Sequence, residues 1–237
     1  MTQNYNTIIL AAGSSLFSLP DGSQISKPNF DIAGEKLIER ITSTYLSDNT
    51  LLAISGESIK FKEKEKRVKN VPVGNTKGAL ISALIAIRDC DLDIPIFITP
   101  GDALISRDIY ENYCKQSLQS NQDISLVVFD SQNPKYSFVR MLDDKLVEVC
   151  EKKVISSKAT AGIFHFKSGH LFIECAEWAI MNNIQTRDLF FLAPSLNYAV
   201  VKGLTLDLFQ IDETDYYRFS NHEEAVASEK RYKSDSQ

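Results

Sequence analysis

Short apolar runs alternate with amphipathic stretches through the first half of the chain. The apolar runs that we expect to form strands lie at residues 7–12, 51–54, 94–98 and 125–129. After residue 35 and within 79–87, apolar residues recur three and four positions apart, which predicts helices that each bury one face. Strands that alternate with helices are typical of an α/β fold built on a mainly parallel sheet.

The second half of the chain has a different pattern. Apolar runs at 136–140, 146–150 and 163–166 follow one another too closely to leave room for crossover helices, so they predict antiparallel strands. We therefore expect a single α/β domain over residues 1–237, with a small antiparallel β extension near residues 135–166. The later elements predicted by the pattern are a helix at 171–181, strands at 198–201 and 206–211, a final helix opening at 212–219, and a frayed polar tail at 228–237.

Composition and charge narrow the class of protein. The chain has 237 residues, of which 43% are hydrophobic and 24% charged, as expected of a globular protein. Its net charge of −5 leaves no basic excess to neutralise a nucleic-acid backbone, which argues against a nucleic-acid partner. The mixed charges at 60–69 favour a solvated helix or loop over a phosphate-binding patch.

Cysteine spacing and hydropathy indicate the compartment. The four cysteines lie far apart without a CxxC pair, which fits reduced thiols better than a disulfide framework or a zinc site. The longest near-apolar stretch, 79–87, is too short to span a bilayer, and the polar start of the chain shows no signal peptide. We expect a cytoplasmic protein without a membrane partner.

Candidate chemistry begins where the first strand ends. The apolar run 7–12 is broken by Gly13, Ser14 and Ser15, a sequence that favours a tight loop whose N–H groups can face phosphate oxygens. Lys27 follows a flexible stretch and could supply a positive charge to such a ligand. An ordinary turn followed by a surface lysine would have the same local pattern.

Two later turns add candidate groups. A glycine-rich turn at 71–78 precedes a helix, and a helix N-terminus beside glycine is a ready site for an anion. Asp102 stands just past the strand predicted at 94–98. Because ligands of open α/β sheets gather at the carboxyl ends of strands, Asp102 can share a site with Gly13, where a carboxylate beside phosphates often holds a divalent metal. A turn-forming or helix-capping aspartate is the alternative.

The order of these pieces resembles the sugar-phosphate nucleotidyltransferases, the nucleoside-diphosphate-sugar pyrophosphorylases. The matching segments are residues 10–13, Lys27-Pro28, 34–37, 74–79, 100–102, 147–153, 159–166 and 210–215, so the resemblance covers roughly residues 7–220. The short form of the chain is most similar to enzymes of capsule and surface-polysaccharide pathways. The resemblance implies a Rossmann-like core of the GT-A type, and transfer of a nucleotidyl group from a nucleoside triphosphate to a phosphorylated small acceptor, with release of pyrophosphate.

The resemblance also implies roles for individual residues. Catalysis would rest on Lys27, Asp102 and Asp212, and the two aspartates would bind Mg²⁺ together. The expected nucleotide-binding residues are Leu10, Ala11, Ala12, Gly13, Ser14, Ser15, Lys27, Asn75, Thr76, Gly78, Ala79 and Gly101. The expected acceptor-binding residues are Glu151, Lys152 and Gly162. A phosphate nucleophile is already ionised at neutral pH, so the three histidines are expected to be structural or exposed.

One departure from the family pattern bears on activity. The family usually has a second glycine and an arginine in the first loop, whereas this chain has Leu16 where the arginine is expected. Lys36, Lys77 or Arg107 could substitute for it. Two other functions stay open: a catalytically silent relative that binds nucleotide as a regulator or scaffold, and a glycosyltransferase using the Asp-x-Asp at 91–93, which precedes its strand and so lies at the wrong sheet edge. The sequence leaves open the base, the acceptor and the choice between a monomer and a homodimer.

Overall fold

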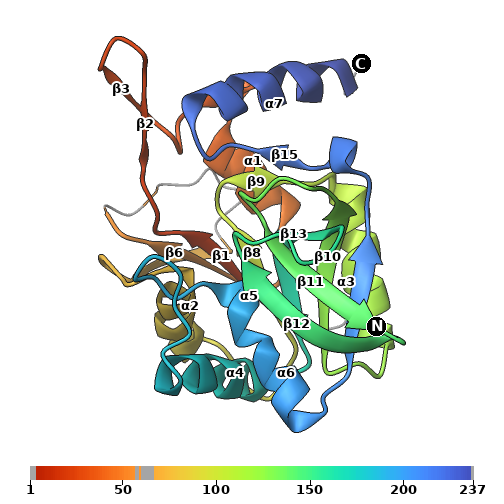
Figure 1. The fold of residues 1–237 in the computed structure, drawn as a ribbon. Helices are drawn as coiled ribbons and strands as arrows, with labels where there is room; N and C mark the ends of the chain where they lie inside the picture. Colours follow the sequence, from red (N-terminus) through yellow and green to blue (C-terminus); the bar gives the residue numbers. More distant parts are fainter. Residues whose placement is uncertain (1–3, 57–58, 60–66, 236–237) are drawn as a thin grey trace.

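The fold is organised around one mixed β-sheet (Figure 1). The computed structural model describes residues 4–56, 59 and 67–235. Within these residues the sheet has nine strands, in the order β12-β11-β13-β8-β1-β6-β7, with β10 paired to β13 and to β14. The strands are β1 (Asn6–Ala11), β6 (Asn49–Ile54), β7 (Val68–Pro72), β8 (Ile96–Pro100), β10 (Ile124–Asp130), β11 (Ser137–Leu142), β12 (Lys145–Glu151), β13 (Lys158–Phe166) and β14 (Leu206–Gln210).

The parallel part of the sheet comes from the first half of the chain. β1 pairs in parallel with both β6 and β8, and β7 extends the sheet beyond β6. Successive side chains of β1 point to opposite faces, and Ile8 and Ile9 are both fully buried, each in a different core. A strand covered on both faces needs apolar residues without alternation, which explains the continuous apolar run in the sequence.

The strands near residues 135–166 are antiparallel, as predicted. β11 pairs with β12 and β13, and β13 pairs with β10 and β8, all in antiparallel register. Through the β13–β8 pair these strands join the parallel part in one sheet. The predicted α/β class with a mixed sheet is confirmed.

Helices cover both faces of the sheet (Figure 1). One core lies under α2 (Ala79–Ala86), α4 (Gly169–Met181), α5 (Leu192–Ser195) and α6 (Asn197–Lys202). The other lies under α1 (Leu37–Thr44), α3 (Arg107–Gln119) and α7 (His222–Asp235). None of the described helices is long and apolar enough to cross a membrane.

In the described part of the chain, three small two-stranded sheets lie beside the main one. The hairpin of β2 (Leu16–Ser18) and β3 (Gln24–Ser26) extends from the molecule after β1 (Figure 1). β4 (Asp31–Ile32) pairs with β5 (Glu35–Lys36). β9 (Ala103–Leu104) pairs with β15 (Tyr217–Arg218), which brings the end of the chain beside the loop after β8.

The strand predicted at 198–201 is wrong, because these residues belong to α6. Val200 and Val201 suggested a strand by their β-branched side chains, but they are 43% and 63% exposed, while Tyr198 and Ala199 pack on the core. The helix ends at Gly203, whose φ of 65° is the left-handed conformation common after a helix C-terminus. Packing of one face therefore outweighed the local strand preference.

The final helix begins later than predicted, and the tail is not frayed over 228–235. Residues 213–215 form a short 3₁₀ turn and β15 follows, so α7 starts only at His222. Its start is set by Asn221, whose side-chain oxygen accepts the Glu224 N–H at 2.9 Å. Ser228, inside the predicted tail, exchanges hydrogen bonds with the backbone of Arg218 and thereby ties α7 to β15. Most of the predicted mixed-charge segment 60–69 lies outside the described residues, and its end belongs to β7.

Candidate functional site

The carboxyl ends of β1 and β8 meet, as the sequence predicts. Leu10 lies opposite Pro100 in the parallel register, and the Gly101 N–H donates to the Leu10 carbonyl at 2.9 Å. A Cβ at position 101 would lie 2.6 Å from that carbonyl oxygen, so only glycine fits this close approach. The loops after the two strands therefore lie side by side.

A cavity of about 450 Å³, which we call the loop cavity, opens at this sheet edge. Every residue predicted to bind the nucleotide lines it except Asn75, which is exposed. Its lining consists of Leu10, Ala11, Ala12, Gly13, Ser14, Ser15, Lys27, Pro28, Ile38, Thr76, Gly78, Ala79, Ser82, Gly101, Asp102, Leu189 and Phe191. Backbone and small side chains thus form most of the wall.

Lys27 and Asp102 form an ion pair inside this cavity. The Lys27 Nζ lies 3.1 Å from the Asp102 Oδ2, and the side chains are 10% and 41% exposed. The Lys27 N–H donates to the Ser15 carbonyl at 2.8 Å, which fixes the lysine against the first loop. Lys27 Nζ also lies 5.4 Å from the centre of the Phe17 ring. A held, mostly buried ammonium is suited to binding an anionic ligand oxygen.

The segment before α5 completes the loop cavity, and sequence reasoning missed it. The Phe190 N–H donates to the Lys77 carbonyl, and the Phe190 carbonyl accepts the Leu80 N–H. Gly78 has a φ of 109°, and a Cβ there would lie 2.3 Å from the Phe190 carbonyl oxygen. The chain near residue 190 is therefore locked by its backbone onto the predicted base-binding turn, and it places Leu189 and Phe191 in the cavity wall.

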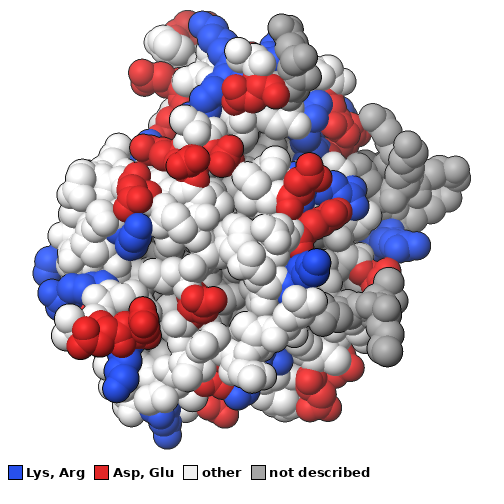
Figure 2. Space-filling view, turned by 90° about the vertical axis from the view of Figure 1, so that its right-hand side faces the viewer, with Lys and Arg blue, Asp and Glu red and all other residues white. Residues whose placement is uncertain are grey.

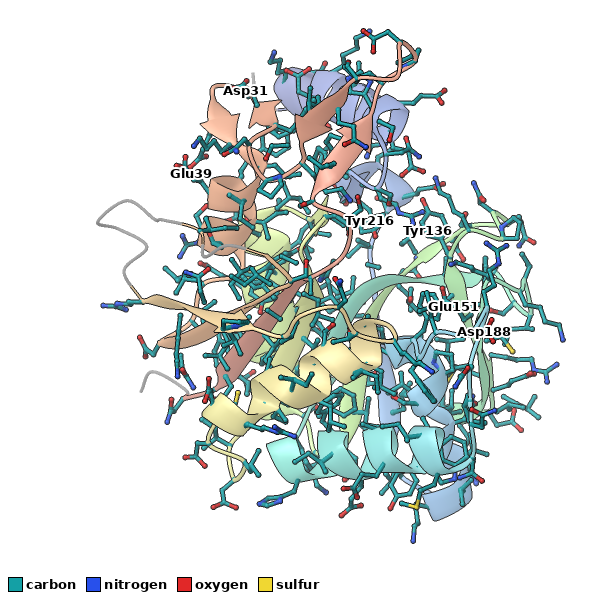
Figure 3. The ribbon with its side chains drawn as sticks, turned by 90° about the vertical axis from the view of Figure 1, so that its left-hand side faces the viewer. Asp31, Glu39, Tyr136, Glu151, Asp188 and Tyr216 are labelled. Atoms are coloured by element: carbon teal, nitrogen blue, oxygen red, sulfur yellow. The ribbon has the colours of Figure 1, made fainter. Side chains whose placement is uncertain are left out.

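A second cavity of about 240 Å³, the sheet cavity, lies on the other side of Asp102. The two cavities share four lining residues: Leu10, Ala79, Asp102 and Phe191. Figure 3 shows three residues of the sheet cavity, Tyr136, Glu151 and Tyr216, on one side of the molecule. The predicted acceptor residues Glu151 and Gly162 line it as well. Lys152 is not among the lining residues, but its Nζ lies 4.5 Å from the centre of the Phe191 ring.

Glu151 is a buried carboxyl at the wall of the sheet cavity. Burial raises its pKa, and the hydrogen bond from Ser137 and the nearby Lys152 and Arg218 offset only part of that effect. Gly162, with a φ of 76°, lies on β13 over Pro100, where a Cβ would make only ordinary contact at 3.8 Å. The glycine is therefore required by its backbone conformation rather than by crowding.

Lys135 and Arg218 line the sheet cavity and were not predicted. They come from the loop before β11 and from a strand of two residues. Neither segment has a periodic pattern, so no local signal in the sequence marks them. The Phe219 N–H donates to the Asp102 carbonyl at 2.8 Å, which sets the Arg218 segment beside the β8 loop.

The two aspartates predicted to bind magnesium do not line a common cavity in the described chain. Asp212 is exposed, and in the described part of the chain it lines neither the loop cavity nor the sheet cavity. No group of three or more His, Cys, Asp or Glu side chains that could hold a metal ion occurs among the described residues. Lys27 pairs with the Asp102 carboxylate, and Lys135, Glu151 and Arg218 line the sheet cavity together with it. Neither cavity is lined by both Asp102 and Asp212 in the described chain.

The suggested substitutes for the loop arginine also lie elsewhere. In the described chain, none of Lys36, Lys77 and Arg107 lines the loop cavity, and Arg107 is paired with Glu111 at 2.7 Å. Leu16 is 42% exposed on β2. On the face shown in Figure 2, basic and acidic side chains are intermingled around an uncharged centre, in keeping with the net charge of −5.

No family model and no curated protein sequence matches the chain. Among solved structures, a nucleoside-diphosphate-sugar pyrophosphorylase from Vibrio cholerae has a TM-score of 0.75 at 16% identity, over 95% of this chain and 99% of that one. A Bacillus anthracis protein assigned as a glucose-1-phosphate thymidylyltransferase has a TM-score of 0.73 at 16% identity, over 96% and 94%.

The inositol-1-phosphate CTP transferase from T. maritima is also similar, with a TM-score of 0.68 at 15% identity over 96% of each chain. These structures share the fold over nearly the full length of the chain, although their sequences are only 15–16% identical to it. The chain therefore has the fold of the sugar-phosphate nucleotidyltransferases.

Proposed function

We propose that the protein transfers a nucleotidyl group from a nucleoside triphosphate to a phosphorylated small molecule and releases pyrophosphate. The observation that carries this proposal is the Lys27–Asp102 pair at the junction of two cavities. Two anionic substrates that react with one another need two adjoining cavities and a cation where they meet. The loop cavity would hold the nucleotide, and the sheet cavity would hold the acceptor.

The reaction asks little covalent chemistry of the protein. A phosphate oxygen of the acceptor forms a bond to the α-phosphorus, and the bond from that phosphorus to the departing pyrophosphate breaks. Alignment of the two substrates and stabilisation of the charge on the departing pyrophosphate are the main requirements. Because the acceptor phosphate is already ionised, no side chain has to remove a proton.

The described residues can divide these tasks. Backbone N–H groups of the loop at 13–15 would bind nucleotide phosphates, and Lys27 would stabilise the charge at the reacting phosphate. Thr76, Gly78 and Ala79 would lie against the base, while Glu151 and Gly162 would position the acceptor. Asn75 and Lys152 would act from the edges of the two cavities.

Magnesium dependence is part of the resemblance, but the proposal gives the ion no protein-held position, because Asp102 and Asp212 do not share a cavity in the described chain. From the cysteine spacing and the hydropathy pattern we also propose a cytoplasmic location, and from the resemblance a product that serves in capsule or surface-polysaccharide synthesis. The tests of the chemistry do not depend on either statement.

Pyrophosphate release tests the proposed reaction. The four ribonucleoside triphosphates and dTTP would each be combined with glucose 1-phosphate, inositol 1-phosphate and other phosphorylated sugars and polyols, in magnesium and in EDTA. We expect release with one pair, and a loss of roughly 100-fold or more in Asp102→Asn, a magnitude typical of one charge-stabilising group at a reacting centre. Asp212→Asn is the matched control and should stay within about threefold of the wild type, since its side chain lines neither cavity in the described chain. Equal losses in the two variants would restore the predicted aspartate pair.

A second function is favoured by the charge of the loop cavity. Among the described residues that line it, Lys27 is the one basic side chain, and residues 13–26 contain no Lys or Arg. The protein could therefore bind a nucleotide without turning it over, as a regulator or scaffold. Calorimetric binding of a nucleotide, together with no pyrophosphate release across the whole substrate matrix, would select this function.

A further inference from the structure

The sheet cavity contains two cations that come from distant parts of the chain. Lys135 precedes β11 and Arg218 lies in β15, and both side chains line the cavity beside Asp102. The Lys135 side chain is 36% exposed and the Arg218 side chain 26%, so both are partly withdrawn from solvent while they still reach open space. Such groups are available to a ligand that enters the cavity.

The two cations contact the same two groups, the Tyr136 ring and the Glu224 carboxylate. Lys135 Nζ lies 5.0 Å and Arg218 Cζ 5.3 Å from the centre of the Tyr136 ring. Glu224, in the first turn of α7, has one oxygen 2.8 Å from Lys135 Nζ and the other 3.8 Å from Arg218 Nε. Burial acts to raise the pKa of the Glu224 carboxyl, but Lys135 and Arg218 outweigh burial and hold that pKa below its usual range. The carboxylate therefore stays charged and orients both cations.

Among the described residues, Glu224 is the carboxylate that pairs with both cations. Asp102 and Glu151 also line the cavity, and Arg218 acts on the Glu151 carboxyl electrostatically, but neither forms an ion pair with Lys135 or Arg218. The N–H groups that Glu224 does not use can therefore meet a ligand. Because the cations are already oriented by the ring and by Glu224, a ligand would lose little additional side-chain freedom on binding. A guanidinium also presents paired N–H groups that match the oxygens of a phosphate.

The position of this pair relative to Asp102 indicates its ligand. Arg218 lies opposite Ala103 in the β15–β9 pair, one residue from Asp102, whose carboxylate holds Lys27. A phosphate bound by Lys135 and Arg218 would therefore lie on the sheet-cavity side of the Lys27–Asp102 pair. The loop cavity, on the other side, contains only Lys27 as a basic lining residue in the described chain.

We infer that Lys135 and Arg218 bind the phosphate monoester of the acceptor in the sheet cavity, beside Asp102. The identity of the ligand as the acceptor rests on the proposed function, whereas the phosphate site itself does not. The site binds phosphate without a divalent cation. Neither residue is assigned to the nucleotide.

Binding of inorganic phosphate, measured by ³¹P NMR titration in EDTA, tests this site. The wild type should bind phosphate saturably, and Arg218→Gln and Lys135→Gln should each weaken binding about tenfold, as expected for loss of one charge-assisted contact. Arg218→Lys should fall between, because it keeps the charge and loses the paired geometry. Arg140→Gln is the matched control: Arg140 is 50% exposed and paired with Glu148 outside both cavities.

Several outcomes would overturn the inference. Binding that requires added Mg²⁺, or that is equally strong in the wild type, Arg218→Gln and Lys135→Gln, would remove the fixed-cation site. If Arg218→Gln does not fold, the phosphate affinity of Lys135→Gln tests the site instead, because Lys135 lies on a separate segment. Phosphate binding that depends on Arg218, without pyrophosphate release from any substrate pair, would retain the site and reject the proposed reaction. If the protein transfers a nucleotidyl group but binds phosphate equally well without Lys135 or Arg218, the proposed reaction would be retained and the phosphate site rejected.

Discussion

The two cavities that meet at Asp102 are built by different means. The loop cavity is shaped by backbone: the close approach of Gly101 to Leu10, and of Gly78 to Phe190, leaves no room for a Cβ. The sheet cavity is shaped by side chains, with Lys135 and Arg218 held against Glu224 and the Tyr136 ring. A ligand in the first cavity would meet backbone, small side chains and the Lys27–Asp102 pair, whereas one in the second would also meet Lys135, Glu151 and Arg218. Changes of sequence should therefore affect shape in the first cavity and charge in the second.

The largest effect should follow from a side chain added to the backbone-built cavity. In Gly78→Ala the new Cβ meets the Phe190 backbone, at a φ that alanine rarely adopts, so we expect a loss of about 4 kcal/mol in the free energy of unfolding. Gly74→Ala is the control, because its φ of 66° is also positive but no atom lies within 4 Å of the new Cβ. It should cost about 1 kcal/mol. Urea unfolding of both variants measures the difference, and equal losses would show that the Phe190 contact is unimportant.

A pH-dependent effect should appear in β13, which lines the sheet cavity. His165 is 2% exposed, neither ring nitrogen has a partner among the described residues, and burial lowers its pKa from 6.5 to about 4. Below pH 6.5 the unfolded chain binds a proton at this residue and the folded chain does not, so stability falls as the pH decreases. The loss should approach about 3 kcal/mol near pH 4.

Replacement of the ring tests this contribution. His165→Phe keeps an aromatic ring against Phe97 and should flatten the decline in the free energy of unfolding between pH 6.5 and 4. His170→Asn is the control, since His170 is exposed and only faces Asp93. If the decline is the same in all three proteins, carboxyl groups rather than His165 govern the acid sensitivity.

The smallest effect should come from adding charge beside the loop cavity, at Leu16, which follows the lining residues Ser14 and Ser15. Leu16→Arg puts a guanidinium on the exposed edge of β2, next to the loop at 13–15, and should tighten the binding of a nucleoside triphosphate about fivefold. The nucleoside monophosphate should be little affected, because it lacks the outer phosphates. Leu142→Arg is the control, at a leucine 65% exposed on β11. If calorimetric titrations find the same affinity for the nucleoside triphosphate in the two variants, the outer phosphates bind away from the β2–β3 hairpin.

The loop cavity was largely predictable from the sequence, and the sheet cavity only in part. Gly13 and Asp102 follow the parallel strands β1 and β8, and parallel strands bring their carboxyl ends to one edge wherever each strand occurs in the chain. Lys27 follows the β2–β3 hairpin, and the hydrogen bond from its N–H to the Ser15 carbonyl returns it to the first loop. Lys135 and Arg218 lie on a loop and on a strand of two residues, so their meeting depends on tertiary packing that no local pattern encodes. The same dependence on tertiary packing explains Asp212. Its motif predicted a position in the site, but its side chain is exposed in the structure.

The fold likewise has regions that could be predicted from the sequence and regions that could not. The buried strands of the first half were recognisable because each needs an unbroken apolar run. The error at 198–201 arose because β-branched residues can equally occupy the exposed side of a short helix, and only contacts with distant segments decide between the two. Prediction was reliable where burial is complete and poor where half of a segment faces water.

The backbone bonds between Phe190 and the turn at 77–80 constrain how the protein folds during synthesis. The first strands and α2 leave the ribosome more than a hundred residues before their partner, a delay of roughly ten seconds at ordinary elongation rates. Until then the turn containing Gly78 has unpaired backbone groups and an uncovered wall. The loop cavity should therefore be completed late in synthesis, and a ligand of that cavity should be unable to stabilise the chain before residue 190 has been made.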